Sequence, residues 1–188
     1  MNYISGMDIV LYEAFQIHAS RPWLDALMVI WRNPWFWLPL YVFLVFKLFL
    51  SSEVYKPWLI FVLLVGSLIT VDLISSKVLK PLVARERPCW QADVLTVPEL
   101  LPCGGKNSFP SNHAWNHMHL VVFLSIVWPS PYIWVRLGAV LWAVSIGIAQ
   151  VYVGKHFFGD IAAGIVLGTS SGLLTAILYR RIIFKRRT

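Results

Sequence analysis

The feature that most constrains this chain is a succession of long apolar runs separated by short polar segments. A helix needs about 20 mostly apolar residues to cross a bilayer core about 30 Å thick. Five runs approach or reach this length, at residues 35–50, 58–80, 114–128, 133–150 and 161–183. Charged residues make up 13% of the chain, about half of the usual share in soluble domains. We therefore expect an all-α membrane protein in which these runs form five spans.

The N-terminal segment, residues 1–33, differs from these runs because polar residues interrupt it throughout. Its apolar residues still recur at helical spacing, as Leu24, Leu27 and Trp31 do. This pattern favours one or two amphipathic helices that lie at the membrane interface, and a sixth span is the alternative. The length of the chain favours a single domain over residues 1–188.

Basic residues near the C-terminus predict which way the bundle crosses the membrane. Arg180, Arg181 and the cluster 185–187 favour a cytosolic C-terminus, because loops rich in lysine and arginine stay on that side. Counting the spans back from it places the segments 81–112 and 151–160 on the outer face. Both segments carry basic side chains against this rule, which suggests an anionic ligand there. The short basic tail lacks a partner fold, so no nucleic-acid partner is expected.

The first candidates for binding an anion are Lys80 and Arg87, at the start of the first outer segment. They are seven residues apart, close to two helical turns, so both can face one way if the helix continues past Pro81. A guanidinium offers a fork of donors to phosphate oxygens, and an ammonium offers a point charge. The alternative is a pair of cations that anchor a span at the interface.

Two further polar stretches open the spans that follow the outer segments. Ser111 and the backbone amides of Asn112 and His113 start the third span, where a helix N-terminus favours an anion. His156 and Asp160 are four residues apart, so on a helix the carboxylate can hold the imidazole in one tautomer. Such an imidazole is a nucleophile or a base. The alternatives are ordinary capping by Ser111 and a dipole-complementing acid at Asp160.

Together, these stretches resemble the three signature motifs of the type-2 phosphatidic acid phosphatase superfamily, which also contains vanadium haloperoxidases and bacterial acid phosphatases. The first motif is a lysine, six residues and Arg-Pro, matched by Lys80 and Arg87-Pro88. The second, Pro-Ser-Gly-His, reads Pro110-Ser111-Asn112-His113. The third, Ser-Arg, five residues, His, three residues and Asp, reads Ala149-Gln150, His156 and Asp160. The match covers residues 80–160 and implies a membrane helix bundle around one phosphate site.

The sequence departs from the family pattern at two positions. Asn112 replaces a glycine, which keeps the backbone amide. Gln150 replaces an arginine that in the family helps to bind phosphate, so a positive charge is lost there. Lys155, next to the expected nucleophile, or Lys106 could supply that charge. Without such a substitute, phosphate affinity falls, and a catalytically inactive member is the alternative.

Carried over residue by residue, the resemblance implies a covalent mechanism that needs no metal or other cofactor. His156 would attack phosphorus to form a phosphohistidine, with Asp160 orienting its ring. His113 would protonate the leaving lipid oxygen and then activate water. The phosphoryl oxygens would be held by the remaining candidates, Lys80, Arg87, Ser111, Asn112, Gln150 and Lys155.

Histidines and cysteines near the second motif raise the question of a metal site. His113, His117 and His119 with Cys103 lack an acidic partner of known spacing, so no metal is expected. If its segment is extracytosolic, Cys103 is instead expected to form a disulfide with Cys89, and two free thiols are the alternative.

The resemblance implies a lipid phosphatase of the bacterial plasma membrane, with its site facing the periplasm or the cell exterior. Undecaprenyl diphosphate is the first expected substrate, and a lipid A phosphate or phosphatidylglycerol phosphate is the alternative. Two other classes remain open. One is an intramembrane hydrolase that uses Ser111 as nucleophile, and the other is a lipid-binding or lipid-translocating protein without catalysis, which Gln150 would favour.

Overall fold

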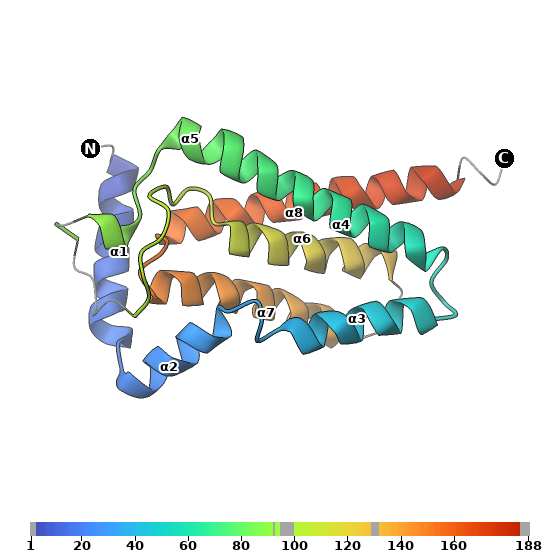
Figure 1. Cartoon of the computed structure of the whole chain (residues 1–188), viewed down its shortest axis with the longest axis horizontal. Helices are drawn as coiled ribbons and strands as arrows, with labels where there is room; N and C mark the ends of the chain where they lie inside the picture. Colours follow the sequence, from blue (N-terminus) through green and yellow to red (C-terminus); the bar gives the residue numbers. More distant parts are fainter. Residues whose placement is uncertain (1–2, 92, 95–99, 129–131, 185–188) are drawn as a thin grey trace.

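The protein is a bundle of long helices with a transverse helix across one end (Figure 1). A computed structural model describes residues 3–91, 93–94, 100–128 and 132–184. Its α-helices are α1 (Tyr3–Ala19), α2 (Pro22–Trp31), α3 (Leu38–Leu50), α4 (Pro57–Ile74), α5 (Lys80–Val83), α6 (Asn112–Val127), α7 (Ile133–Tyr152) and α8 (Phe158–Phe184). A π-helical turn, Ser75–Leu79, joins α4 to α5, and a 3-10 turn, Pro88–Trp90, follows in the loop. The predicted all-α fold is confirmed.

Among the described residues, three stretches of helix are long and apolar enough to cross a membrane. They are Pro57–Val83, Ile133–Tyr152 and Phe158–Phe184. The helices at two other expected spans are shorter than these, since α3 has 13 residues and α6 has 16. At a rise of about 1.5 Å per residue, both are shorter than the bilayer core is thick.

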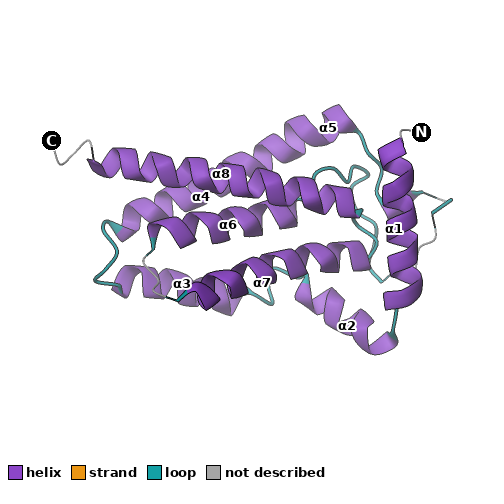
Figure 2. Cartoon of the chain, turned by 180° about the vertical axis from the view of Figure 1, so that it is seen from behind, coloured by secondary structure: helices purple, strands orange, loops and turns teal. Residues whose placement is uncertain are grey.

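The closest helix pair is α6 with α8, and small residues on α8 make it possible (Figure 2). A Cβ on Gly164 would lie 2.8 Å from the carbonyl oxygen of Ser111. A Cβ on Gly168 would lie 2.5 Å from that of Trp115. Any side chain at these positions would push the helices apart, and small residues spaced by four are typical of tightly packed membrane helices. The spacing therefore brings the start of α8 against the start of α6.

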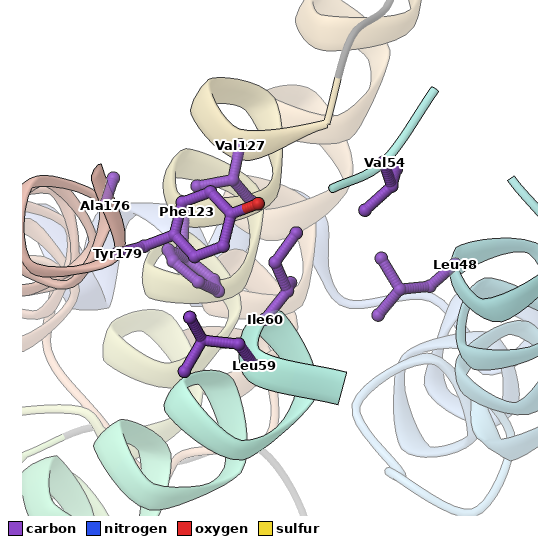
Figure 3. Packing of buried hydrophobic residues seen from close by; sticks show 8 residues of the cluster. All are labelled: Leu48, Val54, Leu59, Ile60, Phe123, Val127, Ala176 and Tyr179. Carbon is purple, nitrogen blue, oxygen red and sulfur yellow. The ribbon is translucent and has the colours of Figure 1, made fainter. Parts of the chain in front are cut away.

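The opposite end of the bundle is closed by an apolar cluster (Figure 3). It joins side chains from α3, α4, α6, α8 and the loop before α4: Leu48, Val54, Leu59, Ile60, Phe123, Val127, Ala176 and Tyr179. The Tyr179 hydroxyl donates a hydrogen bond to the carbonyl oxygen of Tyr55. This cluster packs the helices together at the end of the bundle away from the three motifs.

The N-terminal segment forms two helices, and α1 lies across the end of the bundle where the three motifs meet (Figure 1). Gln16 of α1 donates from Nε2 to the carbonyl oxygens of Val151, at 3.0 Å, and Tyr152, at 3.2 Å. The Tyr152 hydroxyl donates in turn to Asp25 of α2 at 2.5 Å. The N-terminal segment, predicted to lie at the membrane interface, thus packs over the end of the bundle that carries the three motifs.

Candidate active site

The second and third motifs meet at the starts of α6 and α8. Ser111 caps α6, where its Oγ accepts from the backbone amide of Ala114 at 3.5 Å. The backbone amide of Ser111 donates to the carbonyl oxygen of Asp160 at 3.1 Å. These contacts bind the two helix starts together, with Ser111 and Asp160 both fully buried.

His156 lies in the turn between α7 and α8 and faces Asp160. Its Nδ1 is 3.4 Å from Asp160 Oδ2, within reach of an ion pair but longer than a well-formed hydrogen bond. The same Oδ2 accepts from the backbone amide of Phe157 at 2.9 Å. Burial lowers the pKa of His156 to about 4, although Asp160 acts to raise it. The imidazole is therefore neutral at pH 7, as a nucleophile must be.

Arg85 compensates the buried charge of Asp160, a role that the sequence analysis missed. Its Nη1 donates to Asp160 Oδ1 at 2.9 Å, and its Nη2 donates to Asp8 Oδ2 at 2.7 Å. Asp8, on α1, also accepts from the backbone amide of Gly159. A buried carboxylate without a nearby cation would be costly. The sequence offered a signal for this contact, because the first motif contains an arginine besides Arg87. The chain from Asp160 through Arg85 to Asp8 ties α1 to the site.

Lys80 and Arg87 converge on the loop that precedes α6. Lys80 Nζ lies 3.4 Å from the carbonyl oxygens of Asn107 and Ser108, and Arg87 Nε lies 3.4 Å from that of Asn107. Arg87 Nη1 donates to the carbonyl oxygen of Cys103 at 3.0 Å. Burial lowers the pKa of Arg87, and the charge of Asp160 opposes this shift. The two cations of the first motif thus lie together and within electrostatic reach of the third motif.

A disulfide bond cross-links the loop that contains Arg87 and its acceptor. It joins Cys89 to Cys103, whose Cα atoms are 5.9 Å apart. The carbonyl oxygen of Cys103 is the Arg87 acceptor, and the backbone amide of Cys89 donates to Gly154 in the turn before His156. The disulfide therefore links the first motif to the third.

Asn112 uses its side chain inside the bundle. Its Nδ2 donates to Asp72 Oδ1 at 2.5 Å, and its Oδ1 accepts from the Ser75 hydroxyl at 2.6 Å. Asp72 lies on α4, and Ser75 begins the π-helical turn. The backbone amide of Asn112, at the start of α6, is therefore the group of this residue that can donate to an anion.

His113 stacks on His117, which belongs to a hydrogen-bonded chain. The two rings are 6.3 Å apart and inclined by 11°. His117 Nδ1 is 2.7 Å from the carbonyl oxygen of His113, and its Nε2 is 2.8 Å from the Tyr41 hydroxyl. His119 lies apart from them, between the hydroxyls of Ser67 and Ser171. Within the described part of the chain, no group of three or more His, Cys, Asp or Glu side chains is arranged to hold a metal.

Gln150 is buried near the end of α7, and the cation beside it differs from the expected ones. Lys155 donates from Nζ to the carbonyl oxygens of Leu101 and Pro102, and Lys106 pairs at the surface with Glu86. The contact to Gln150 comes from Arg32, whose Nε donates to its Oε1 at 3.1 Å. Arg32 is thus the cation whose side chain contacts Gln150 Oε1, and the role expected of Lys106 or Lys155 stays a prediction.

Two apolar cavities flank α3 on the side of the bundle away from α8. One, of about 310 Å³, lies between α3, α4 and α6 and reaches Tyr41, Asn116 and His117 beside the site. The other, of about 520 Å³, lies between α3, α6 and α7. Leu44 lines both. The site thus adjoins apolar spaces of the kind that a lipid chain occupies.

Comparisons with known proteins agree with the motifs. The sequence model of the PAP2 superfamily matches residues 57–184. The lipid A 4'-phosphatase of Bacteroides thetaiotaomicron is 31% identical over 180 residues, which cover 93% of this chain and 77% of that protein. The lipid A 4'-phosphatase of Porphyromonas gingivalis is 28% identical and covers 92% and 72%. The crystal structure of a transmembrane PAP2 type phosphatidylglycerolphosphate phosphatase from Bacillus subtilis, 26% identical, superimposes with a TM-score of 0.68 and covers 97% and 89%.

Proposed function

This chain belongs to the PAP2 superfamily, and from this premise we propose that it removes a phosphate monoester from a lipid A-type glycolipid. The broader activity is that of a metal-independent membrane lipid phosphatase. The observation that carries the proposal is the neutral, buried His156 facing Asp160, within electrostatic reach of the cations of the first motif. The choice of lipid is supported by two relatives named lipid A 4'-phosphatases, which this chain matches over most of their length.

The reaction would proceed through a phosphohistidine. Nδ1 of His156 faces the Asp160 carboxylate, which leaves the Nε2 lone pair to attack phosphorus. The bond to the lipid oxygen breaks, and His113 gives that oxygen its proton. His113 then takes a proton from water, which attacks phosphorus, frees His156 and releases inorganic phosphate. Asp160 stabilises the positive charge that develops on the imidazole.

The charge of the transferring phosphoryl group would be stabilised by fixed donors. Lys80 and Arg87 bring two positive charges to one place, and the backbone amide of Asn112 adds a helix N-terminus. Such preorganised groups need no rearrangement as charge develops in the transition state. Both cations contact the carbonyl oxygen of Asn107, and this shared contact, which keeps them close together, supports the assignment.

The acyl chains would lie in the cavities beside α3. The smaller cavity ends at Asn116 and His117, and His117 stacks on His113, the proposed acid. A lipid entering there would have its phosphate near the motifs and its chains among apolar side chains. Undecaprenyl diphosphate, the first expectation from the sequence, stays a prediction that the same assay tests.

The orientation in the membrane is also part of the proposal. The disulfide between Cys89 and Cys103 suits an oxidising compartment, and the basic residues that end α8 suit the cytosol. We therefore place the protein in a bacterial inner membrane with the active site towards the periplasm.

The test is phosphate release by purified protein in detergent with a chelator present. The lipids are a 4'-phosphorylated lipid A, phosphatidylglycerol phosphate and undecaprenyl diphosphate. His156→Ala should lose activity by about a thousandfold or more, because removal of a covalent nucleophile leaves only binding effects. His18→Ala, which changes an exposed histidine at the end of α1, is the matched control.

The outcomes separate the alternatives. Fastest release from lipid A and an acid-labile phosphoenzyme that vanishes in His156→Ala would support the proposal. Full activity in His156→Ala would exclude the phosphohistidine. Faster phosphate release from undecaprenyl diphosphate than from lipid A would make undecaprenyl diphosphate the substrate, as the sequence first predicted, and would leave the mechanism unchanged.

A further inference from the structure

Arg32 stands at the end of α2, and an aromatic cluster fixes its position against α7. The indole of Trp31 donates to the hydroxyl of Ser145 at 2.9 Å. The Trp31 and Trp37 rings pack edge to face at 4.6 Å, and Trp37 packs in the same way on Trp142 of α7 at 5.4 Å. The backbone of Arg32 closes α2 by donating to Met28. These contacts hold the end of α2 against α7, within reach of Gln150.

The Arg32 and Gln150 side chains have more donors than protein acceptors. Gln150 is 1% exposed, and its Nε2 has no hydrogen-bond partner among the described residues. Arg32 is half-buried and donates from Nε to Gln150 Oε1. Its two terminal nitrogens meet no acceptor in the part of the chain that the structure describes. A buried donor without an acceptor is costly, so the buried Nε2 of Gln150 points to a ligand that accepts from it, beside the remaining donors of Arg32.

The surrounding charge identifies the kind of ligand. Burial lowers the pKa of Arg32, and the positive charge of Arg87 lowers it further. Arg32 therefore lies within electrostatic reach of a cation of the first motif, and the two repel each other. An anion between them would remove that repulsion and accept from both guanidinium groups.

Resting on the proposed function, we propose that Arg32 and Gln150 together bind the phosphate of the substrate. Arg32 supplies the positive charge, and Gln150 orients the guanidinium through Oε1 while donating from Nε2. The cation at this corner of the site thus comes from the N-terminal segment, 118 positions earlier in the chain than Gln150. The pair would act on the phosphate oxygens opposite Lys80 and Arg87.

The experiment measures binding of inorganic phosphate and of orthovanadate to the full-length protein in detergent, apart from turnover. Arg32→Ala should weaken both affinities by about 10- to 100-fold, the range of a lost charged hydrogen bond. The double variant Arg32→Ala with Gln150→Arg should recover most of the loss, because it restores a guanidinium in the space vacated by Arg32. Arg21→Ala, at an exposed arginine bonded to its neighbour Ser20, should bind as wild type does.

The possible results are distinct. Wild-type affinity in Arg32→Ala would overturn the inference, whatever the substrate. Loss in Arg32→Ala with an unchanged melting temperature and rescue by Gln150→Arg would establish it. If Arg32→Ala unfolds, Arg32→Gln keeps the hydrogen bond to Gln150 without the charge, and unchanged anion binding there would equally overturn it. A wild type that binds phosphate through Arg32 but cleaves no lipid would contradict the proposed function alone.

Discussion

The two sides of α6 differ in how the neighbouring helix packs. On one side, α8 approaches so closely that a Cβ at Gly164 or Gly168 would collide with the α6 backbone. On the other side, α3 is separated from α6 by cavities of about 310 and 520 Å³. Ser111 and Asp160, at the starts of α6 and α8, belong to the tight side.

This difference suggests a division of tasks. A reaction that depends on ångström-scale placement of His156 and Asp160 needs helices that cannot shift. A lipid chain needs space that can adapt to it, and α3 leaves that space. Replacements on the tight side should therefore reduce stability and activity together, while those on the loose side should change the response to lipid chain length.

The largest effect is expected at the tight side, from Gly168→Ala. The new methyl would lie 2.5 Å from the carbonyl oxygen of Trp115 and 2.8 Å from the Cβ of Met118, so α8 must move away. Overpacking of this kind typically costs about 1–3 kcal/mol, or a fall in melting temperature of about 2–12 °C. Thermal unfolding in detergent and phosphate release would be measured together, and both should fall.

The matched control is Gly66→Ala on α4. A Cβ there meets nothing within 4 Å, and alanine favours a helix, so the melting temperature should stay level or rise slightly. If both variants lost stability and activity equally, the comparison would fail, because the loss in Gly168→Ala could then not be assigned to the close packing of α8 on α6.

A smaller and more selective effect is expected on the loose side, from Leu44→Trp. Leu44 lines both cavities, and an indole there would occupy space otherwise open to a lipid chain. We expect kcat/KM for a long-chain lipid phosphate to fall about tenfold, the scale of a misfit in an apolar pocket. Hydrolysis of a short-chain, water-soluble analogue should be unchanged.

Leu174→Trp, on the exposed face of α8, controls for the bulk of the new side chain. It should leave both substrates unaffected. If Leu44→Trp slowed the short-chain analogue as much as the long-chain lipid, the cavities would not be chain-binding spaces.

The sequence was informative wherever chemistry is set by local spacing. The spacings from His156 to Asp160 and from Lys80 to Arg87 name residues that the fold brings to one end of the bundle. Neither pair lies on one helix, as the helical argument expected, because α5 ends at Val83, before Arg87, and α8 begins at Phe158, after His156. The apolar runs also marked the bundle helices. The apolar runs did not predict the exact helix lengths, since α3 is shorter than its apolar run.

Partners across long separations carried no pattern that the sequence could reveal. Arg32 is a lone arginine at the end of a short helix, and nothing local links it to Gln150. Asp8 resembles any polar residue of an amphipathic helix, yet it reaches Arg85 across the end of the bundle. These contacts depend on how α1 and α2 fold back, which is a tertiary property. The four-residue glycine spacing on α8 was visible in the sequence, but it identifies the partner helix only once the packing is known.

The smallest effect concerns protonation on the tight side. Burial lowers the pKa of His156 to about 4, against about 6.5 for an ordinary histidine, and Asp160 opposes the shift. Because the folded-state pKa is the lower one, the folded protein binds fewer protons there than the unfolded chain between about pH 6.5 and about pH 4. This residue therefore lowers the free energy of unfolding as pH falls through that window and has no such effect above it. Titration of 15N-labelled imidazoles by NMR, with the signal assigned by its loss in His156→Ala, should show His156 neutral from pH 8 down to about pH 5. A midpoint near 6.5 would mean that water reaches the ring, and the packing of α6 on α8 would then not be what keeps this imidazole neutral.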